Sequence, residues 1–147
     1  MDDDRLKHSI SVARKMVSIA KRFNLTDEEI NNCFVIGLNH DIGYEFNKNG
    51  ESHGKVGGEI LKSSNFKYWK EIYYHGLTNP NYVSIYLDIL NMADMQIDKF
   101  GSDVGYDKRL EDIKSRYGEE SSVYKTCYNL VNELKRKEDK YEQRRNN

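Results

Sequence analysis

The four histidines of this 147-residue chain all belong to one spaced series that also contains two aspartates. The series is His8, His40 with Asp41 directly after it, His53, His75 and Asp94. Neutral imidazoles and carboxylates are the ligands that borderline and hard divalent metals take. Six such groups can hold two ions that share a bridging carboxylate, an arrangement suited to metal-assisted hydrolysis of a phosphate ester.

The order His…His-Asp…His…His…Asp, which includes the tetrapeptide His40-Asp41-Ile42-Gly43, resembles the HD-domain superfamily of metal-dependent phosphohydrolases. The other segments that carry the resemblance are Arg5-Leu6-Lys7-His8, Ser52-His53-Gly54, Tyr74-His75 and Met92-Ala93-Asp94. Together the matching segments span residues 5 to 98. The resemblance implies a helical fold and a dinuclear metal site.

The resemblance also implies a role for each ligand. Asp41 is the expected bridging carboxylate, and with His40 it forms the expected catalytic pair. The other ligands divide between two ions: His8 and Asp94 join His40 on the first, and His53 and His75 bind the second. The ligand types admit Fe, Mn, Co, Ni or Zn, and also Mg, because affinity order alone does not decide which metal occupies a site.

Side chains outside the ligand set are candidates for binding substrate or for orienting ligands. Arg5, one turn before the first histidine, and Lys55, two residues after the third, are the best-placed cations for a phosphate, and Arg109 is a third candidate. For each of these cations a solvated surface charge is the competing interpretation. Asp98 follows the last aspartate ligand by four residues and could accept an imidazole N–H. Tyr44 and Glu45, just beyond the His-Asp pair, are expected at the mouth of the site.

Three functions remain open from the sequence. The leading hypothesis is hydrolysis of a phosphoester or phosphoanhydride bond, with a nucleotide as the favoured small-molecule partner. The chain lacks the Gly-Tyr-Pro element of the cyclic-di-GMP branch and the Ala-Lys expected after His-Asp in diadenosine tetraphosphate hydrolases, so neither substrate is favoured. The alternatives are a mixed-valence di-iron oxygenase with the same ligands and a non-catalytic metal- or ligand-binding domain.

Composition excludes several classes of protein. With 37% hydrophobic and 32% charged residues and a net charge of −1, the chain is expected to be a polar globular protein without general affinity for nucleic acid or membranes. Its longest apolar run, residues 33–38, is far shorter than the roughly 20 residues of a membrane span. Two cysteines without a Cys-x-x-Cys pairing suggest reduced thiols and a cytoplasmic location. Both a monomer and a homodimer remain open.

Apolar spacing predicts an all-α fold, a single helical bundle of about six or seven helices over residues 1–147. The expected helices cover residues 3–23, 26–40, a stretch from 53 onward, 67–76, 82–100, 107–117 and 120–142. Thr26 and Glu29 form an expected capping box. Residues 44–52 are expected to be a loop, and residues 135–147 a solvated, frayed basic end.

Glycines near the ligands predict local geometry. Gly43 is expected to stop the second helix and to let His40 and Asp41 converge, because adjacent residues point about 100° apart inside a helix. The pair Gly57-Gly58 costs roughly 1 kcal/mol per glycine inside a helix. A neighbouring backbone is therefore expected to come close to that pair.

Overall fold

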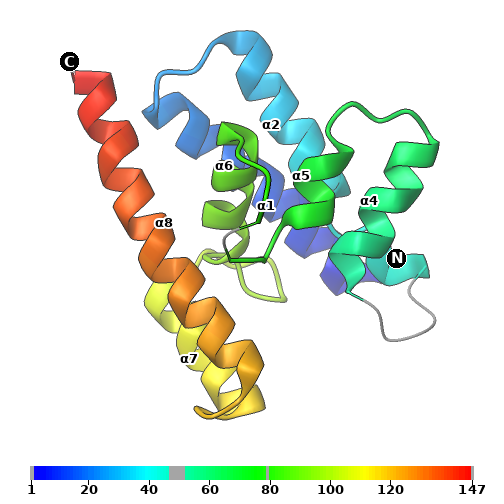
Figure 1. Cartoon of the computed structure of the whole chain (residues 1–147), viewed down its shortest axis with the longest axis vertical. Helices are drawn as coiled ribbons and strands as arrows, with labels where there is room; N and C mark the ends of the chain where they lie inside the picture. The colour runs from blue at the N-terminus through cyan, green and yellow to red at the C-terminus, as the bar shows by residue number, and fades with distance from the viewer. Residues whose placement is uncertain (1, 47–51, 79, 147) are drawn as a thin grey trace.

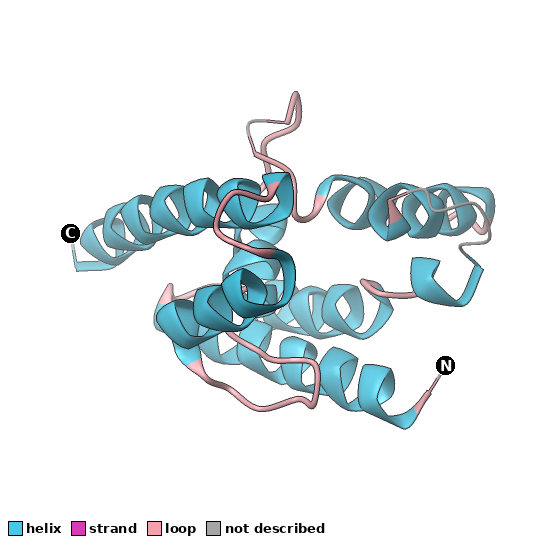
Figure 2. Cartoon of the chain, turned by 90° about the horizontal axis from the view of Figure 1, so that it is seen from below, coloured by secondary structure: helices cyan, strands magenta, loops and turns pink. Residues whose placement is uncertain are grey.

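The structure is a computed structural model that describes residues 2–46, 52–78 and 80–146. Within these residues the chain is helical and forms no β-strand, only an isolated bridge between Ile97 and Asp103 (Figure 2). The helices are α1 (Asp3–Arg22), α2 (Asp27–Asn39), α3 (Gly43–Phe46), α4 (His53–Ser63), α5 (Trp69–Tyr74), α6 (Ile85–Asp94), α7 (Gly105–Tyr117) and α8 (Ser122–Asn146). The predicted all-α class is confirmed, and α3, a single turn, lies in a segment expected to be a loop. None of the described helices is long and apolar enough to span a membrane.

Helix α6 lies at the centre of the fold, between two groups of helices (Figure 1). On one side it packs against α1, α2 and α5, and α4 lies beyond against α5. On the other side it packs against α8, which lies alongside α7 as a separate helical hairpin (Figure 1). Every residue of α6 from Leu87 to Ala93 is buried, as expected for a helix that is enclosed on all sides.

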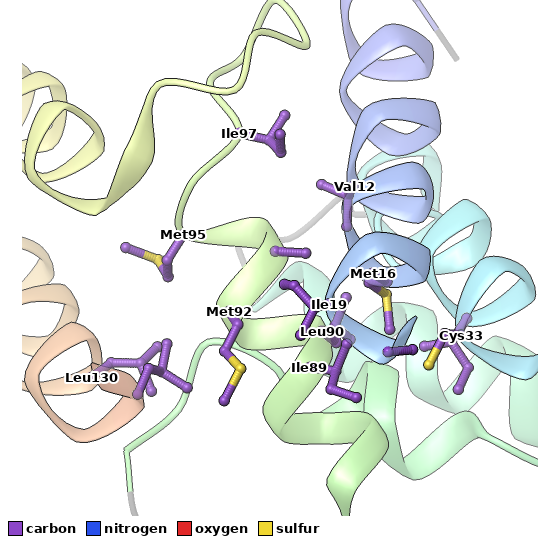
Figure 3. Close-up of a cluster of buried hydrophobic side chains, with 14 of the residues drawn as sticks. Val12, Met16, Ile19, Cys33, Ile89, Leu90, Met92, Met95, Ile97 and Leu130 are labelled. Atoms are coloured by element: carbon purple, nitrogen blue, oxygen red, sulfur yellow. The ribbon is translucent and has the colours of Figure 1, made fainter. Parts of the chain in front are cut away.

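The core is built where α1 and α6 cross (Figure 3). Met16 and Ile19 of α1 meet Ile89 and Leu90 of α6, and all four side chains are almost completely buried. Cys33 of α2 closes one end of this cluster (Figure 3). Burial raises the pKa of its thiol to about 12, so this cysteine is an unreactive core residue.

Two helix ends show why local polar groups override apolar spacing. Helix α6 begins at Ile85 because the Ser84 hydroxyl accepts hydrogen bonds from the Tyr86 and Leu87 amides. It ends at Asp94 and not at residue 100 as predicted. The Asp98 carboxylate accepts hydrogen bonds from two amides of the following turn and so offers the backbone an alternative to the helix. The predicted capping box at the start of α2 is confirmed.

Glycines allow helix backbones to approach closely near the ligands. A Cβ on Gly58 would lie 2.5 Å from the Cβ of Tyr73 in α5, and one on Gly57 would lie 3.0 Å from the Gly43 nitrogen, which confirms the expected close approach. Gly43 differs from its predicted role, since it begins α3 and does not stop α2. A Cβ there would lie 1.8 Å from the His53 carbonyl oxygen, so the position needs glycine for contact with α4.

Helix α8 continues beyond residue 135 to Asn146, and side chains of its last turns are bound on two sides. On α6, the buried Asp88 carboxylate accepts hydrogen bonds from Lys137 Nζ at 2.9 Å and from the Tyr141 hydroxyl at 2.7 Å. On α1, Arg22 forms an ion pair with Glu142 at 2.7 Å. Charged groups therefore dock this part of α8.

Removing the Asp88 carboxylate should weaken this docking. For Asp88→Ala we expect the free energy of unfolding to fall by about 1.5–3 kcal/mol, the usual contribution of hydrogen bonds to charged groups. Glu133→Ala is the matched control, since Glu133 forms only an i,i+4 ion pair with the same lysine at 3.3 Å. Its loss should cost no more than about 0.5 kcal/mol. Urea denaturation of both variants measures the difference, and equal losses would contradict the assignment.

Candidate metal centre

Five helices bring the six predicted ligands together, and most of these ligands lie at helix ends. His8 is in the second turn of α1, while His40 is the C-cap of α2 and Asp41 follows it. The others also sit at ends: His53 begins α4, His75 caps α5 and Asp94 is the last residue of α6. The backbone of His40 still has helical angles, with φ −65° and ψ −27°, and its Nε2 atom lies 3.3 Å from Oδ1 of the adjacent Asp41.

Asp41 lies in the middle of the four imidazoles. Its Oδ1 is 3.3 Å from His40 Nε2, 3.6 Å from His53 Nε2 and 3.9 Å from His75 Nε2. Its Oδ2 faces the other way and is 3.6 Å from His8 Nε2. An oxygen of this carboxylate therefore lies within 4 Å of the Nε2 atom of each of the four imidazoles.

The remaining ligands form two groups around Asp41. Asp94 Oδ1 is 2.9 Å from His8 Nε2 and 3.4 Å from His40 Nε2. On the opposite side, His53 Nε2 and His75 Nε2 are 3.2 Å apart. The ligand atoms are close enough for one cation to be held by His8, His40 and Asp41, and another by Asp41, His53 and His75.

Backbone carbonyls fix the orientation of three of the imidazoles. The Nδ1–H of His8 donates to the Asp98 carbonyl at 2.8 Å, that of His40 to the Gly37 carbonyl at 2.7 Å, and that of His75 to the Ile72 carbonyl at 2.6 Å. A carbonyl only accepts, so Nδ1 carries the hydrogen and each Nε2 points its lone pair toward the centre when the ring is neutral. Histidines that bind metals are usually held in this way.

One buried atom of the site lacks a partner. His40 Nε2 is buried and forms no hydrogen bond within the described part of the chain, although carboxylate oxygens of Asp41 and Asp94 lie nearby. Buried polar atoms are rarely left unsatisfied, and a missing ion is one ordinary explanation. The donor set and this atom together fit a bound metal.

The charges of Asp41 and Asp94 and the burial of His40 shift the pKa of this histidine in opposite directions. Burial lowers the pKa of His40, but the Asp41 and Asp94 carboxylates outweigh it and raise this pKa to about 9. Burial also raises the pKa of Asp94, and the His40 and His8 imidazoles outweigh that effect and hold it well below its usual range. The centre therefore attracts positive charge, and a bound metal would displace the His40 proton.

The pKa values of the His53 and His75 imidazoles are shifted in the opposite direction, downward. Burial, and then the neighbouring His75, lower the pKa of His53 to about 4. Burial and the neighbouring His40 also lower the pKa of His75. Both rings are therefore neutral near pH 7, which is the state in which an imidazole binds a metal.

Over residues 5–142 the chain matches the family described as HD domain. The chain belongs to the HD-domain family. Neither the curated proteins nor the solved structures give a significant match to it. The family is largely one of metal-dependent hydrolases. The matched range contains all six candidate ligands and extends into α8, beyond the segments that carry the resemblance in the sequence.

In this HD-domain protein Asp98 supports the site through its backbone and not through its side chain. Its carbonyl oxygen accepts the His8 Nδ1–H, whereas its carboxylate accepts the amides of Phe100 and Ser102. Asp98 therefore accepts a hydrogen bond from a histidine, as predicted, but through its backbone carbonyl and not through the predicted carboxylate. The reason is that α6 ends before Asp98, so its side chain does not continue the helix face of Asp94.

A three-layer stack covers the His53 side of the centre. The Tyr44 ring lies parallel to the His53 ring, with centroids 4.1 Å apart and an interplanar angle of 18°. The Arg5 guanidinium lies 3.3 Å from the Tyr44 centroid, and its Nη1 is 3.9 Å from Asp41 Oδ2. Arg5 is one-third exposed, so it is held near the centre while its charge still reaches solvent.

The stack predicts that Tyr44 positions His53. We expect Tyr44→Leu to weaken metal binding at the His53 side by about tenfold, the lower end of the usual effect of groups that support ligands. Tyr44→Phe keeps the ring and should bind metal like the unchanged protein. A competition titration with a chromophoric chelator measures both, and equal affinities for the two variants would show that the ring has no positioning role.

A cavity of about 600 Å³ opens onto the histidine–aspartate centre. Arg5 and Tyr44 line it, as the sequence predicts. Arg109 also lines it, and its Nε donates to the Asp94 carbonyl at 3.3 Å. Lys55 does not line the cavity and is an exposed residue of α4, so its predicted role in binding substrate is not supported. It follows His53 by two residues, which turns it about 200° away around the helix.

Several cavity residues are not identified from the sequence. Lys99 and Arg116 add positive charge, and three consecutive acids at the start of the chain, Asp2, Asp3 and Asp4, add negative charge. Arg116 follows Arg109 by seven residues, a spacing that places both on one helix face. That spacing is the one signal in the sequence that could have indicated Arg116.

Proposed function

We propose that this HD-domain protein is a two-metal phosphohydrolase that cleaves a phosphoester or phosphoanhydride bond, with nucleotides as the leading substrate class. The observation that carries the proposal is the inward direction of the histidine Nε2 atoms around a central carboxylate. Three of the imidazoles are oriented by backbone carbonyls, and the buried His40 Nε2 forms no hydrogen bond with the described residues. Such a centre has little structural use without a cation.

The residues present suit two ions that share Asp41. The first would be held by His8, His40, Asp41 and Asp94, and the second by Asp41, His53 and His75. Metal ions in such a pair supply an activated water and neutralise charge that develops on the phosphate. The protein's part is to orient the imidazoles, which the carbonyls of Asp98, Gly37 and Ile72 do.

Cations beside the centre would bind the phosphate oxygens. Arg5 and Arg109 both line the cavity at the level of the ligands, since one approaches Asp41 and the other donates to the Asp94 carbonyl. Cys127 also lines the cavity, but burial raises the pKa of its thiol. A protonated thiol is a poor nucleophile, which favours attack by water over a covalent cysteine intermediate.

The test is elemental analysis of the purified protein, followed by a hydrolysis screen. Bis-p-nitrophenyl phosphate and a panel of nucleotides would be offered with Mn, Fe, Co, Ni, Zn or Mg. We expect about two ions per chain and turnover of a phosphoester. In His40→Ala we expect both the bound metal and the turnover to be lost. Turnover that survives in His40→Ala would contradict the assignment of the centre.

Two other outcomes would replace the proposal. A protein that binds metal but turns over no phosphoester with any of these ions is a binding domain. Oxygen consumption together with a mixed-valence iron EPR signal, after anaerobic purification, would instead identify a di-iron oxygenase.

A further inference from the structure

The cavity is lined by an acidic group and a basic group of residues that come from different elements. Asp2, Asp3 and Asp4, around the N-terminus of α1, form an acidic wall. Lys99 and two arginines of α7, Arg109 and Arg116, form a basic wall. An anionic ligand that reaches the histidine–aspartate centre is therefore repelled from one side and attracted toward α7.

The cations of the basic wall are available to a ligand. Among the described residues, the ion pairs that form use other cations, and none joins Lys99, Arg109 or Arg116 to a carboxylate. Arg109 uses only its Nε, for the Asp94 carbonyl. A guanidinium has five N–H donors, so Arg109 retains donors for an anion.

These three cations also line a second, adjoining groove of about 280 Å³. Two carboxylates, of Asp98 and Asp112, share that groove, and the first already accepts two amide hydrogen bonds. Arg109 and Arg116 are seven residues apart on α7, which is about 10 Å along a helix. The three residues of the basic wall therefore form a stripe of positive charge that extends from the cavity into this groove.

Apolar side chains lie beside the stripe. Ile113, between the two arginines on α7, and Val123, at the start of α8, both line the cavity, as does the half-exposed ring of Tyr117. A ligand that follows the stripe thus has an apolar and aromatic surface next to its charged groups. This combination suits a molecule with a chain of phosphates joined to a ring system.

We propose that Lys99, Arg109 and Arg116 form a second anion-binding subsite, which holds the further phosphates of a substrate whose reacting phosphate lies at the histidine–aspartate centre. The inference rests on the proposed function and narrows it to substrates with two or more linked phosphates, such as a nucleoside triphosphate. A monophosphate would leave the stripe unused. Arginine and lysine are suited to this task because they form strong charge-assisted hydrogen bonds with phosphate oxygens.

The experiment measures binding without metal, so that it does not depend on catalysis. Protein treated with chelator and then desalted is titrated calorimetrically with inorganic tripolyphosphate and with orthophosphate. We expect tripolyphosphate to bind more tightly, with an affinity that falls as NaCl is added, because the cations at the surface are screened by salt. The double variant Lys99→Gln/Arg116→Gln should bind tripolyphosphate at least about tenfold more weakly.

Lys114→Gln is the matched control, because Lys114 is an exposed cation of the same helix that lines neither cavity. It removes one positive charge, where the double variant removes two, and should leave tripolyphosphate binding unchanged. Equal binding of tripolyphosphate and orthophosphate, or an unchanged affinity in the double variant, would overturn the subsite. An equal loss in Lys114→Gln would show only a general effect of net charge and would overturn it too.

Catalysis provides a separate readout. With metal bound, the ratio of KM for a nucleoside triphosphate to KM for bis-p-nitrophenyl phosphate should rise in the double variant and stay unchanged in Lys114→Gln. Tripolyphosphate binding that depends on the stripe, in a protein that hydrolyses nothing, would reject the proposed function and retain an anion site. Hydrolysis with an unaltered KM ratio would retain the function and reject the subsite.

Discussion

Asp41→Asn should give a folded protein that binds little metal and hydrolyses no phosphoester. The Asp41 carboxylate is the one ligand that faces all four imidazoles, with Oδ1 toward three of them and Oδ2 toward His8. An amide has nearly the same shape but supplies one oxygen and no charge. It can therefore no longer serve two ions.

The expected fall in metal affinity exceeds about 100-fold, because the loss of a group that merely supports a ligand already costs about 10–100-fold. Elemental analysis after dialysis measures the bound metal, and circular dichroism checks the fold. Asp103→Asn is the matched control, since that exposed carboxylate pairs only with Lys15, at 2.8 Å. Metal retained by Asp41→Asn at the level of this control would remove Asp41 from the ligand set.

Gly43→Ala should reduce both stability and metal binding. An alanine in place of a helical glycine normally stabilises by roughly 0.5–1 kcal/mol. Here the new Cβ would lie 1.8 Å from the carbonyl oxygen and 2.7 Å from the carbonyl carbon of His53, so the backbone of a ligand must move. Overpacking of this kind costs about 1–3 kcal/mol or more, and we expect the sign of the ordinary effect to be reversed.

The variant Gly118→Ala is the control that separates the loss of stability in Gly43→Ala from its loss of metal binding. At Gly118 a Cβ would meet no atom within 4 Å, but the φ of +94° is one that alanine rarely adopts. The backbone cost there should be about 1–3 kcal/mol, similar to that of Gly43→Ala. Thermal unfolding measures both stabilities and a chelator titration measures metal. The Gly118 variant should keep its metal, and equal metal loss in both variants would mean that low stability alone empties the centre.

The candidate ligands could be identified from the sequence because their residue types are scarce. All four histidines are used, so their order carries nearly all of the signal. The structure brings every member of the series to one centre. Gly57 and Gly58 also allowed a close helix contact to be predicted. Glycine destabilises a helix, and this loss of stability is offset where a side chain would prevent two backbones from approaching.

The substrate side of the cavity could not be identified in this way. Exposed lysines and arginines are common, and only the meeting of α7 with the end of α6 shows which of them face the centre. Lys55 does not line the cavity, because its proximity to His53 in sequence does not place it on the same helix face. The role of Asp98 depends on its carbonyl oxygen, which every residue possesses, so no pattern of side chains reports it.

The ligands come from α1, α2, α4, α5 and α6 and their ends, while α7 and α8 supply none. A cation that binds only the folded form stabilises those five helices by mass action, by about 2.7 kcal/mol when it is present at 100 times its dissociation constant. The α7–α8 hairpin gains from this only indirectly, through its contacts with α6 and α1. The two halves of the cavity would thus respond separately to mutation: changes on the hairpin would alter the proposed anion subsite and leave the candidate metal ligands in place.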